Sequence, residues 1–290
     1  MKLKANAKIN LLLDITGVKE NGYHSLFTIM QSVSLGDEVT VERTQGEEIT
    51  VSCNVSGVPT DKSNIVYKCA EKFFQYSHIE KDKGIHIHID KKTPFGAGMG
   101  GGSADGAAVL VALNKLFGTA YHEKILCRIG AMVGADIPFC IVGGTALCLD
   151  TGAIVAPLED MEGYTILIVK PQSSVSTKEA YAAVDALTDM KHPKNQQMLQ
   201  LLSDGRWSSA LKLCSNVFEQ AIEIPGRVDI KDICNKNGAA AACMTGSGSA
   251  VFGIFENAED AQKAADILKD KFKEIYICAP SKQGVEILSE

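Results

Sequence analysis

The sequence has little that would suit a secreted, zinc-binding or membrane-spanning protein. Its nine cysteines are an odd number and include no Cys-x-x-Cys pair, which favours reduced core cysteines over a disulfide or zinc framework. His86 and His88 share one strand face but have no matching Cys or His cluster nearby. The N-terminus resembles neither a signal peptide nor a transit segment, and no stretch approaches about 18 uncharged apolar residues. We therefore expect a cytoplasmic chain without a membrane span or a metal site of its own.

Positive charge is also scarce. The chain has 29 Lys and Arg against 35 Asp and Glu, a net charge of −6 at pH 7, so it has no broad basic surface for nucleic acid or an anionic membrane. Aromatic residues make up only 6% of the chain, but 46% of its 290 residues are hydrophobic. That is enough for the core of one large domain or two. Any anion must be bound locally, by backbone amides and a few side chains.

Glycine is the residue whose distribution is informative. Five of the 26 glycines lie within Gly96–Gly102, after an alternating strand at residues 85–90 and before an Ala- and Leu-rich helix. Glycine allows positive φ angles, so the amides of such a loop can turn toward one point, and the helix N-terminus adds partial positive charge there. Ser103 is placed to cap that helix. The pattern predicts a phosphate-binding loop; a flexible linker is the alternative, but it would not need these flanking elements.

Three well-known nucleotide motifs do not fit this loop. Gly96, Gly98 and Gly101 match G-x-G-x-x-G, but residues 119–124 do not form the second strand with an acidic end that a dinucleotide site needs. No lysine precedes Ser103, as a P-loop requires, and the chain contains neither His-Arg-Asp nor Asp-Phe-Gly, which protein kinases need. The loop is therefore a phosphate site of another kind.

The mixture of strands and helices along the chain predicts an α+β fold in two lobes, with domains at residues 1–152 and 153–290. Most elements follow from alternating apolar residues or from helical spacing. Strands are expected at residues 3–15, 39–43, 49–53, 85–90, 165–169, 239–244, 250–255 and 274–278. Helices are expected at residues 64–76, 104–117, 121–134, 179–187 and 258–272. A turn is expected at Asp136-Ile137-Pro138.

The run from Pro94 to Ala104, with the sequence PFGAGMGGGSA, resembles the second motif of the GHMP small-molecule kinases. Two further motifs of that superfamily occur in the right order, Lys8-Ile9-Asn10 near the start and Met244-Thr245-Gly246-Ser247-Gly248-Ser249 near the end. Asn21-Gly22-Tyr23-His24 and Gly134-Ala135-Asp136-Ile137-Pro138-Phe139 are similar to one branch, whose substrate is a cytidine-diphosphate-linked alcohol. The resemblance implies an N-terminal lobe like ribosomal protein S5 domain 2 and an α/β sandwich as the C-terminal lobe.

The resemblance also implies roles for single residues. The ATP-binding residues would be Pro94, Phe95, Gly96, Ala97, Gly98, Met99, Gly100, Gly101, Gly102, Ser103 and Ala104. The Ser103 hydroxyl would lie near the phosphates or a Mg²⁺ ion. Asp136 would be the general base or would orient the attacking hydroxyl, and Lys8 would stabilise the developing negative charge and keep Asp136 ionised. By residue type alone, Lys8 would be a solvated strand residue and Asp136 a turn or cap residue.

Substrate contacts follow from the same resemblance. The residues that it assigns to the acceptor are Asn10, Tyr23, His24, Asp136, Ser176 and Thr177. The chemistry suits a nucleobase, because an aromatic ring can stack on cytosine and ring nitrogens can read its polar edge. Without the resemblance, Tyr23 and His24 would be a surface turn after Gly22.

This chain departs from the branch in two places. Ala104 stands where the branch usually has a second serine, so one hydroxyl on the phosphate side is missing. Asn216-Val217-Phe218-Glu219 matches the usual acidic stretch only in part, and we assign no role to it. Neither difference touches Lys8 or Asp136.

The resemblance thus implies ATP-dependent phosphorylation of the 2-hydroxyl of 4-diphosphocytidyl-2-C-methyl-D-erythritol, in the non-mevalonate route to isoprenoid precursors, by a monomer or homodimer that uses ATP and Mg²⁺. Two alternatives remain open. One is another GHMP kinase, acting on homoserine or a mevalonate-type alcohol, although the Tyr23 and His24 motif would have no base to bind there. The other is a nucleotide-binding module without turnover, against which the joint presence of Lys8 and Asp136 argues.

Overall fold

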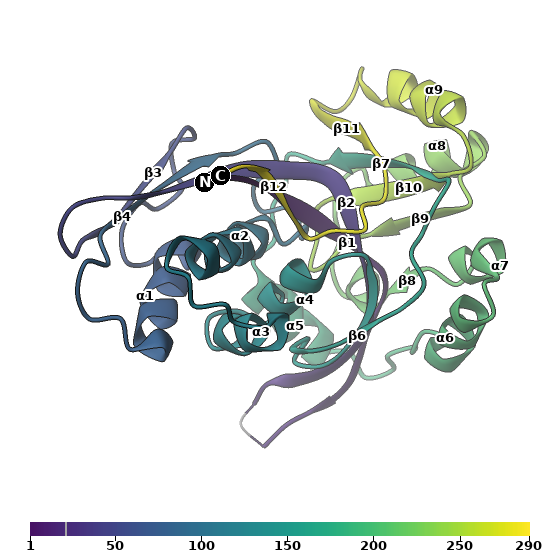
Figure 1. The fold of residues 1–290 in the computed structure, drawn as a ribbon. Coiled ribbons are helices and arrows are strands. Elements are labelled where there is room, and N and C mark those ends of the chain that lie inside the picture. The colour runs from purple at the N-terminus through teal and green to yellow at the C-terminus, as the bar shows by residue number, and fades with distance from the viewer. Residues whose placement is uncertain (21) are drawn as a thin grey trace.

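The computed structural model describes residues 1–20 and 22–290. They form two lobes, each built on one sheet (Figure 1). The first sheet has the strand order β12-β1-β2-β4-β3, with β5 paired to β2, β6 to β5 and β8 to β1. The second has the order β11-β7-β10-β9. The strands are β1 Lys2–Val18, β2 His24–Arg43, β3 Ile49–Cys53, β4 Ile85–Asp90, β5 Thr145–Asp150, β6 Ile154–Pro157, β7 Thr165–Lys170, β8 Ser215–Asn216, β9 Ala241–Met244, β10 Val251–Phe255, β11 Glu274–Cys278 and β12 Val285–Ser289.

Helices cover the sheets in layers. The N-terminal sheet is covered on one face by α1 Ile65–Ser77, α2 Gly101–Leu116, α3 Glu123–Ala131 and α4 Ile137–Val142. One face of the second sheet packs against helices at residues 227–236 and 258–268, and the other against β1, β2 and helices at residues 195–203 and 207–211. The remaining helices are α5 Thr177–Asp185, α6 Asn195–Ser203, α7 Trp207–Leu211, the short 3₁₀ helix η1 Val217–Gln220, α8 Arg227–Lys236 and α9 Ala258–Leu268. Among the described residues, none of these helices has the length and apolar character needed to cross a bilayer.

The central ribbon of β1 and β2 is buried along most of its length because it separates two cores. Leu3 and Ala5 pack against the helices of the first lobe, whereas Ile9 and Leu11 pack with the C-terminal lobe. Alternation therefore predicted β1 correctly, although it does not mark a solvent-exposed face. A strand clamped in this way gives rigid positions to the polar residues between its apolar ones.

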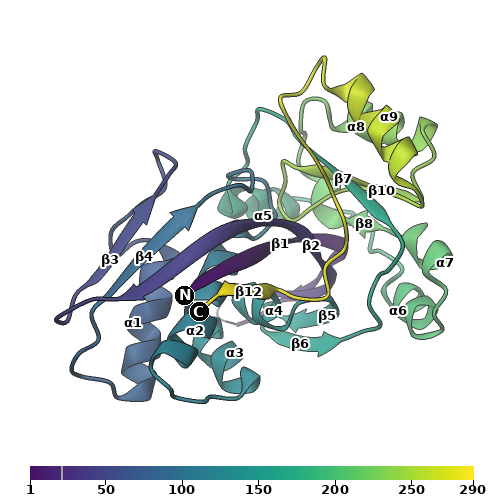
Figure 2. The same ribbon diagram turned by 45° about the horizontal axis from the view of Figure 1, so that its top comes forward.

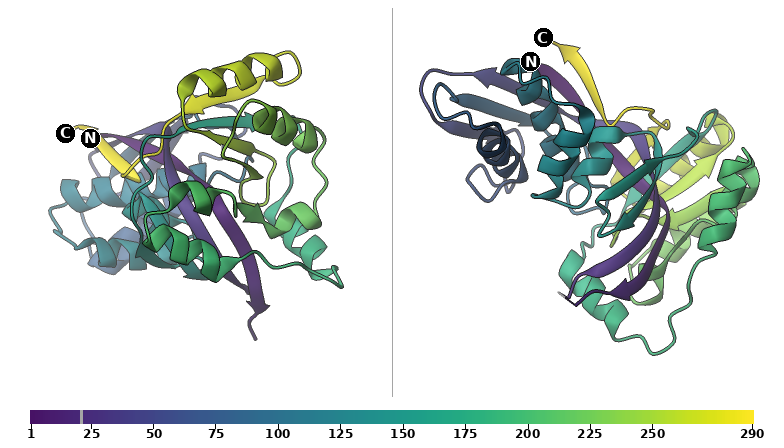
Figure 3. Two further views of the ribbon diagram at one scale, coloured as in Figure 1. Left: turned by 90° about the vertical axis from the view of Figure 1, so that its right-hand side faces the viewer. Right: turned by 60° about the horizontal axis from the view of Figure 1, so that its bottom comes forward.

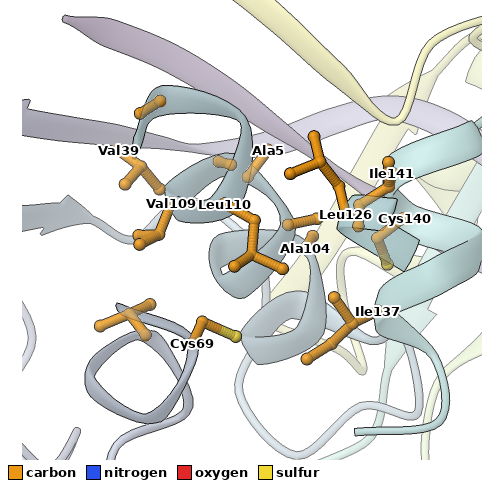
Figure 4. Packing of buried hydrophobic residues seen from close by; sticks show 14 of the residues in the cluster. Ala5, Val39, Cys69, Ala104, Val109, Leu110, Leu126, Ile137, Cys140 and Ile141 are labelled. Carbon is orange, nitrogen blue, oxygen red and sulfur yellow. The ribbon is translucent and has the colours of Figure 1, made fainter. Parts of the chain in front are cut away.

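Small residues let α2 approach its neighbours closely. Ala104 is fully buried, and Figure 4 shows it near Leu110 and Ile137 in the core between α2 and α4. A Cβ atom on Gly106 would lie 2.8 Å from the Cys69 sulfur of α1, so that position has no room for a side chain. The close packing fixes the start of α2, where the glycine loop ends.

The last strand of the chain lies beside the first. After β11 the chain returns to the first lobe, where β12 pairs antiparallel with β1, and the two termini lie side by side in Figures 2 and 3. The expected division at residue 152 falls between β5 and β6, which pair with each other. Domains at 1–152 and 153–290 stay a prediction.

Most expected elements are confirmed, with some corrections. The strands at 49–53, 85–90 and 274–278 match, and β2 extends well beyond the expected 39–43. Two expectations were wrong. Asp136-Ile137-Pro138 starts helix α4, with the proline in its first turn, and α2 begins at Gly101 with Gly100 as its N-cap, so Ser103 does not cap it. Short strands β5, β6 and β12 and helix α8 were missed.

Candidate active site

The glycine loop connects β4 to α2, and every second residue from Gly96 to Gly100 has a positive φ angle. Gly96, Gly98 and Gly100 have φ angles of 65°, 73° and 67°, in a region that residues other than glycine rarely adopt. Within residues 1–20 and 22–290, no hydrogen bond uses the backbone N–H groups from Gly98 to Ser103. The N-terminal dipole of α2 adds to these donors. The predicted phosphate loop therefore has a set of backbone donors available for an anion.

Two neighbouring segments hold this loop in place. Lys8 N–H of β1 donates to the Met99 carbonyl over 3.0 Å, and Ala250 N–H donates to the Ala97 carbonyl over 3.2 Å. A Cβ atom on Gly246 would lie 2.6 Å from the Gly98 carbonyl oxygen. The loop is thus clamped between β1 and the segment at residues 244–249, and both segments contain predicted motifs.

The outer members of the predicted ATP-binding run differ from its glycines. Pro94 is buried, while Phe95 is 69% exposed beside the loop. Ala104 donates its backbone N–H to the Gly100 carbonyl over 2.9 Å and is 0% exposed, so it offers no exposed polar group to phosphates. The Ser103 hydroxyl is half-buried and faces Gly134, where an added Cβ atom would lie 3.9 Å away.

Lys8 and Asp136 meet at the mouth of the loop, although they are far apart in the sequence. Lys8 Nζ lies 3.5 Å from Asp136 Oδ2, and their side chains are 5% and 32% exposed. Asp136 is the N-cap residue of α4, but its carboxylate makes no capping hydrogen bond. A Cβ atom on Gly100 would lie 3.1 Å from Lys8 Cε and 3.6 Å from Asp136 Oδ2. The Lys8 side chain is therefore buried and not solvated, and the Asp136 carboxylate does not cap α4.

Asn10 is predicted as a substrate contact, and in the structure its side chain is engaged with protein groups. It is 1% exposed, and its side chain bonds to protein groups on several sides. Lys8 Nζ donates to Asn10 Oδ1 over 2.7 Å, Gly246 N–H donates to the same oxygen over 3.0 Å, and Asn10 Nδ2 donates to Thr28 Oγ1 over 2.9 Å. The structure therefore brings Asn10 to the predicted site, where its side chain contacts Lys8.

His24 forms a stacked pair with Tyr181. Its ring centroid is 4.4 Å from that of Tyr181 on α5, with 25° between the planes, and its Nε2 is 2.7 Å from Asp185 Oδ1. Tyr23 beside it is 64% exposed. Asn21, the first residue of the same motif, lies outside the described residues.

Tyr181 was missed at the sequence level. Burial and then the negative charge of Asp136 raise the pKa of its hydroxyl to about 12, so the ring lies within electrostatic reach of Asp136. Its ring also makes an edge contact with Phe218, at 5.1 Å between centroids. One tyrosine in a helix has no local signal that separates a ligand-facing ring from a core ring.

Ser176 and Thr177 lie at the start of α5. The Ser176 hydroxyl accepts from Glu179 N–H, and the Glu179 side chain accepts from Ser176 N–H, which forms a capping box. Thr177 Oγ1 is 3.5 Å from Ser247 Oγ. Ser176 is thus used to start a helix, whereas Thr177 faces the segment at 244–249.

A buried ion cluster lies directly behind the loop. The Lys91 ammonium binds Asp37 and lies 3.0 Å from Asp105 Oδ2, and Asp37 also accepts from the Thr93 hydroxyl over 2.8 Å. Burial raises the pKa of the Asp105 carboxyl to about 7, opposed by Lys91 and reinforced by Asp37. A Cβ atom on Gly101 would lie 3.2 Å from Lys91 Nζ, so the cluster contacts the first residue of α2.

Comparisons with known proteins identify the family of the chain. Two family models match, GHMP kinases N terminal domain over residues 64–144 and GHMP kinases C terminal over residues 196–274. The 4-diphosphocytidyl-2-C-methyl-D-erythritol kinase of Caldicellulosiruptor bescii is 42% identical over 279 residues, which cover 96% of this chain and 97% of that protein.

Two solved structures are similar to this chain over nearly its whole length. A 4-(cytidine 5'-diphospho)-2C-methyl-D-erythritol kinase has a TM-score of 0.78 with 27% identity and covers 97% of this chain and 99% of its own. Homoserine kinase from Cytophaga hutchinsonii also has a TM-score of 0.78, with 23% identity, and covers 99% and 97%; this second likeness shows the fold alone. The chain belongs to the GHMP kinases, in the family of the 4-diphosphocytidyl-2-C-methyl-D-erythritol kinases, and is a small-molecule kinase.

Proposed function

We propose that this chain transfers the γ-phosphoryl group of ATP to the 2-hydroxyl of 4-diphosphocytidyl-2-C-methyl-D-erythritol. The observation that supports it most is the position of the Lys8 and Asp136 pair beside Gly100. A carboxylate and an ammonium at the end of a row of unused backbone donors suit a reaction between a hydroxyl group and a phosphate chain. We propose that the protein acts in the cytoplasm, where ATP is abundant. We also propose that it acts as a monomer or a homodimer, since one chain contains all of these residues.

The glycine loop would hold the triphosphate. Its free N–H groups and the dipole of α2 favour negative charge at one point. With a net charge of −6, the chain has no broad positive field that could attract the nucleotide. The Ser103 hydroxyl, in the first turn of α2, would add one side-chain donor. ATP binding is therefore assigned to local donors and not to overall charge.

Asp136 and Lys8 would carry out the transfer. Asp136 accepts the proton of the 2-hydroxyl as that oxygen forms its bond to the γ-phosphorus, and the bond from phosphorus to the bridging β,γ-oxygen breaks to release ADP. Lys8 places a positive charge where negative charge develops. Its burial strengthens this effect, because the ammonium is little screened by water.

Mg²⁺ would accompany the nucleotide. Among the described residues, no group of three or more His, Cys, Asp or Glu side chains could hold a metal ion. Mg²⁺ in kinases is commonly held by phosphate oxygens, water and only one or two protein groups, and the half-buried Ser103 hydroxyl fits that need. When bound, the ion would neutralise charge on the phosphates.

The His24 and Tyr181 pair supports a nucleobase on the acceptor. Stacked rings with a polar edge suit cytosine, since the base can stack on the ring faces while a ring nitrogen binds its polar edge. Asp185 at 2.7 Å fixes the His24 ring. Homoserine and mevalonate have no base, so this pair favours the cytidine-linked alcohol over those substrates, and the Lys8 and Asp136 pair argues against a module without turnover.

An ATP-consumption assay with four acceptors tests the proposal. We expect turnover with 4-diphosphocytidyl-2-C-methyl-D-erythritol and background rates with homoserine, mevalonate and galactose. Turnover with one of the latter three alone would refute the acceptor assignment. Binding of ATP without turnover of any of the four would favour a nucleotide-binding module.

A further inference from the structure

Lys8 and Asn10 lie on the same face of β1. They are two residues apart, so their side chains point to the same side of the strand. The pairing of β1 with β2 shifts register between Asn6 and Lys8 and again between Asn10 and Leu12. Such irregularities redirect side chains and occur often beside active sites. The stretch from Lys8 to Asn10 is thus set apart within a long, otherwise buried strand.

The side chain of Asn10 is committed to the protein. Its Oδ1 accepts from Lys8 Nζ at 2.7 Å and from Gly246 N–H at 3.0 Å, which uses both lone pairs of an amide oxygen. The Thr245 hydroxyl is a further neighbour at 3.2 Å, and the Asn10 backbone N–H donates to it over 3.1 Å. With 1% exposure, Asn10 has no free acceptor to offer a substrate.

We propose that Asn10 is a positioning residue for Lys8, and that it acts by being neutral. The inference rests on the proposed function and departs from the substrate contact that the resemblance implies. Lys8 Nζ has Asn10 Oδ1 on one side at 2.7 Å and Asp136 Oδ2 on the other at 3.5 Å. The amide oxygen orients the ammonium without neutralising it, so its charge stays available to Asp136 and to the transferring phosphoryl group.

A carboxylate at position 10 would have the same shape but a different effect. It would keep Gly246 N–H and the Thr245 hydroxyl as donors. It would lose the Nδ2 donation to Thr28 Oγ1, whose hydroxyl already donates to the Leu12 carbonyl, so the Tm of the variant must be measured beside its kcat. At this short distance and low exposure, an opposite charge would attract Lys8 far more strongly than an amide dipole does. The ammonium would then face a carboxylate on each side, and its pairing with Asp136 would weaken.

Asn10 also connects the lysine to the C-terminal lobe. The segment at 244–249 contacts Gly98 of the phosphate loop through Gly246, and the same Gly246 N–H binds Asn10. Asn216 fixes that segment from behind, with its Nδ2 donating to the carbonyls of Met244 and Gly246 over 2.8 Å each. The loop that binds phosphate and the lysine that acts on it therefore share one anchoring segment.

Asn10→Asp in the full-length enzyme tests this role, with Asn114→Asp as the matched control. Asn114, near the end of α2, is half-buried, and its Oδ1 accepts from the Thr119 hydroxyl and Tyr121 N–H. We expect Asn10→Asp to lower kcat by about 10²- to 10³-fold, the scale of losing one transition-state donor. KM for ATP and for the alcohol should stay within about threefold. We also expect the acidic limb of the pH–rate profile to move to higher pH, while Asn114→Asp keeps the wild-type kcat and profile.

Other outcomes would overturn the role. A raised KM for the alcohol with kcat unchanged would make Asn10 a substrate contact. A lowered Tm with wild-type kcat per folded molecule and an unmoved pH profile would make it purely structural. Failure of the wild-type enzyme to use the cytidine-linked alcohol would instead refute the proposed function, so the two proposals fail separately.

Discussion

Lys8 is buried next to a single carboxylate at the mouth of the phosphate loop, and its neighbours explain what single substitutions should do. Its other contact, Asn10, is neutral. The pair is held by β1 on one side and by the start of α4 on the other. Because neither side chain is needed to complete the helix or the strand, chemistry should be more sensitive than folding to changes here.

Asp136→Asn should lower kcat by about 10²- to 10⁴-fold, because it removes the group that accepts the hydroxyl proton. Lys8→Ala should also lower kcat steeply, through loss of charge stabilisation. ATP binding, measured by titration calorimetry, should be nearly unchanged in both. Asp150→Asn is the control, since Asp150 pairs with Lys19 and is similarly exposed at 35%. Retention of near-normal kcat in either site variant would refute its role.

At the scale of elements, the junction between the glycine loop and α2 is the most constrained place in the site. Gly100→Ala would place a Cβ atom 3.1 Å from Lys8 Cε in a backbone with φ 67°. Gly118→Ala imposes a similar backbone, φ 61°, with nothing within 4 Å. Both should lose about 1–2 kcal/mol of stability, measured by urea unfolding. Only Gly100→Ala should also weaken ATP binding and lower kcat; equal effects on ATP binding would mean that the loop does not hold phosphate.

The buried cluster behind α2 predicts a dependence of stability on pH. Burial raises the pKa of the Asp105 carboxyl to about 7, from an ordinary value of 3.8. The folded state therefore holds a proton that the unfolded state has released between about pH 4 and pH 7, and this contribution to stability is lost as pH rises through that range. Asp105→Asn should flatten this loss, so thermal unfolding at pH 5 and pH 8 should differ less than in the wild type. An unchanged difference would show that Asp105 is ionised throughout.

At the scale of the whole molecule, the C-terminal return reaches the helix that starts at Asp136. A Cβ atom on Gly284 would overlap the Cys140 carbonyl of α4, whereas one on Gly17 of β1 would meet nothing within 4 Å. Gly284→Ala should therefore destabilise the fold by about 1–3 kcal/mol and lower kcat by shifting Asp136. Gly17→Ala should do neither. Comparing unfolding midpoints and kcat for both variants checks this; equal Tm values would mean that the tail only rests on the helix.

The elements that sequence reasoning found are those with a local signal. The strand at 85–90 alternates cleanly, and the glycine loop stands out by composition. Strand β12 was missed because it is short and pairs with β1, which lies far away in the sequence. The start of α4 was predicted as a turn because a proline in a first helical turn has the same local pattern as a proline in a turn.

The same limit applies to the site. Composition and spacing predicted the phosphate loop, but only the resemblance to a family brought Lys8 together with Asp136, since no local rule joins residues so far apart. Tyr181 and the Lys91 cluster were missed because their meaning depends on which elements pack together. For Asn10 the resemblance implies a substrate contact, and the structure adds its bonds to Lys8 and Gly246, because a motif names residues and not the directions in which their side chains point.

The return of β12 to β1 also sets an order of events during synthesis. Residues 285–289 are made long after residues 2–5, with which they pair. The edge of β1 that β12 covers therefore stays open until residues 285–289 have left the ribosome. An exposed strand edge invites pairing with other chains, so the nascent protein carries that risk while its second lobe is being made. The first lobe can close only after the second has been made.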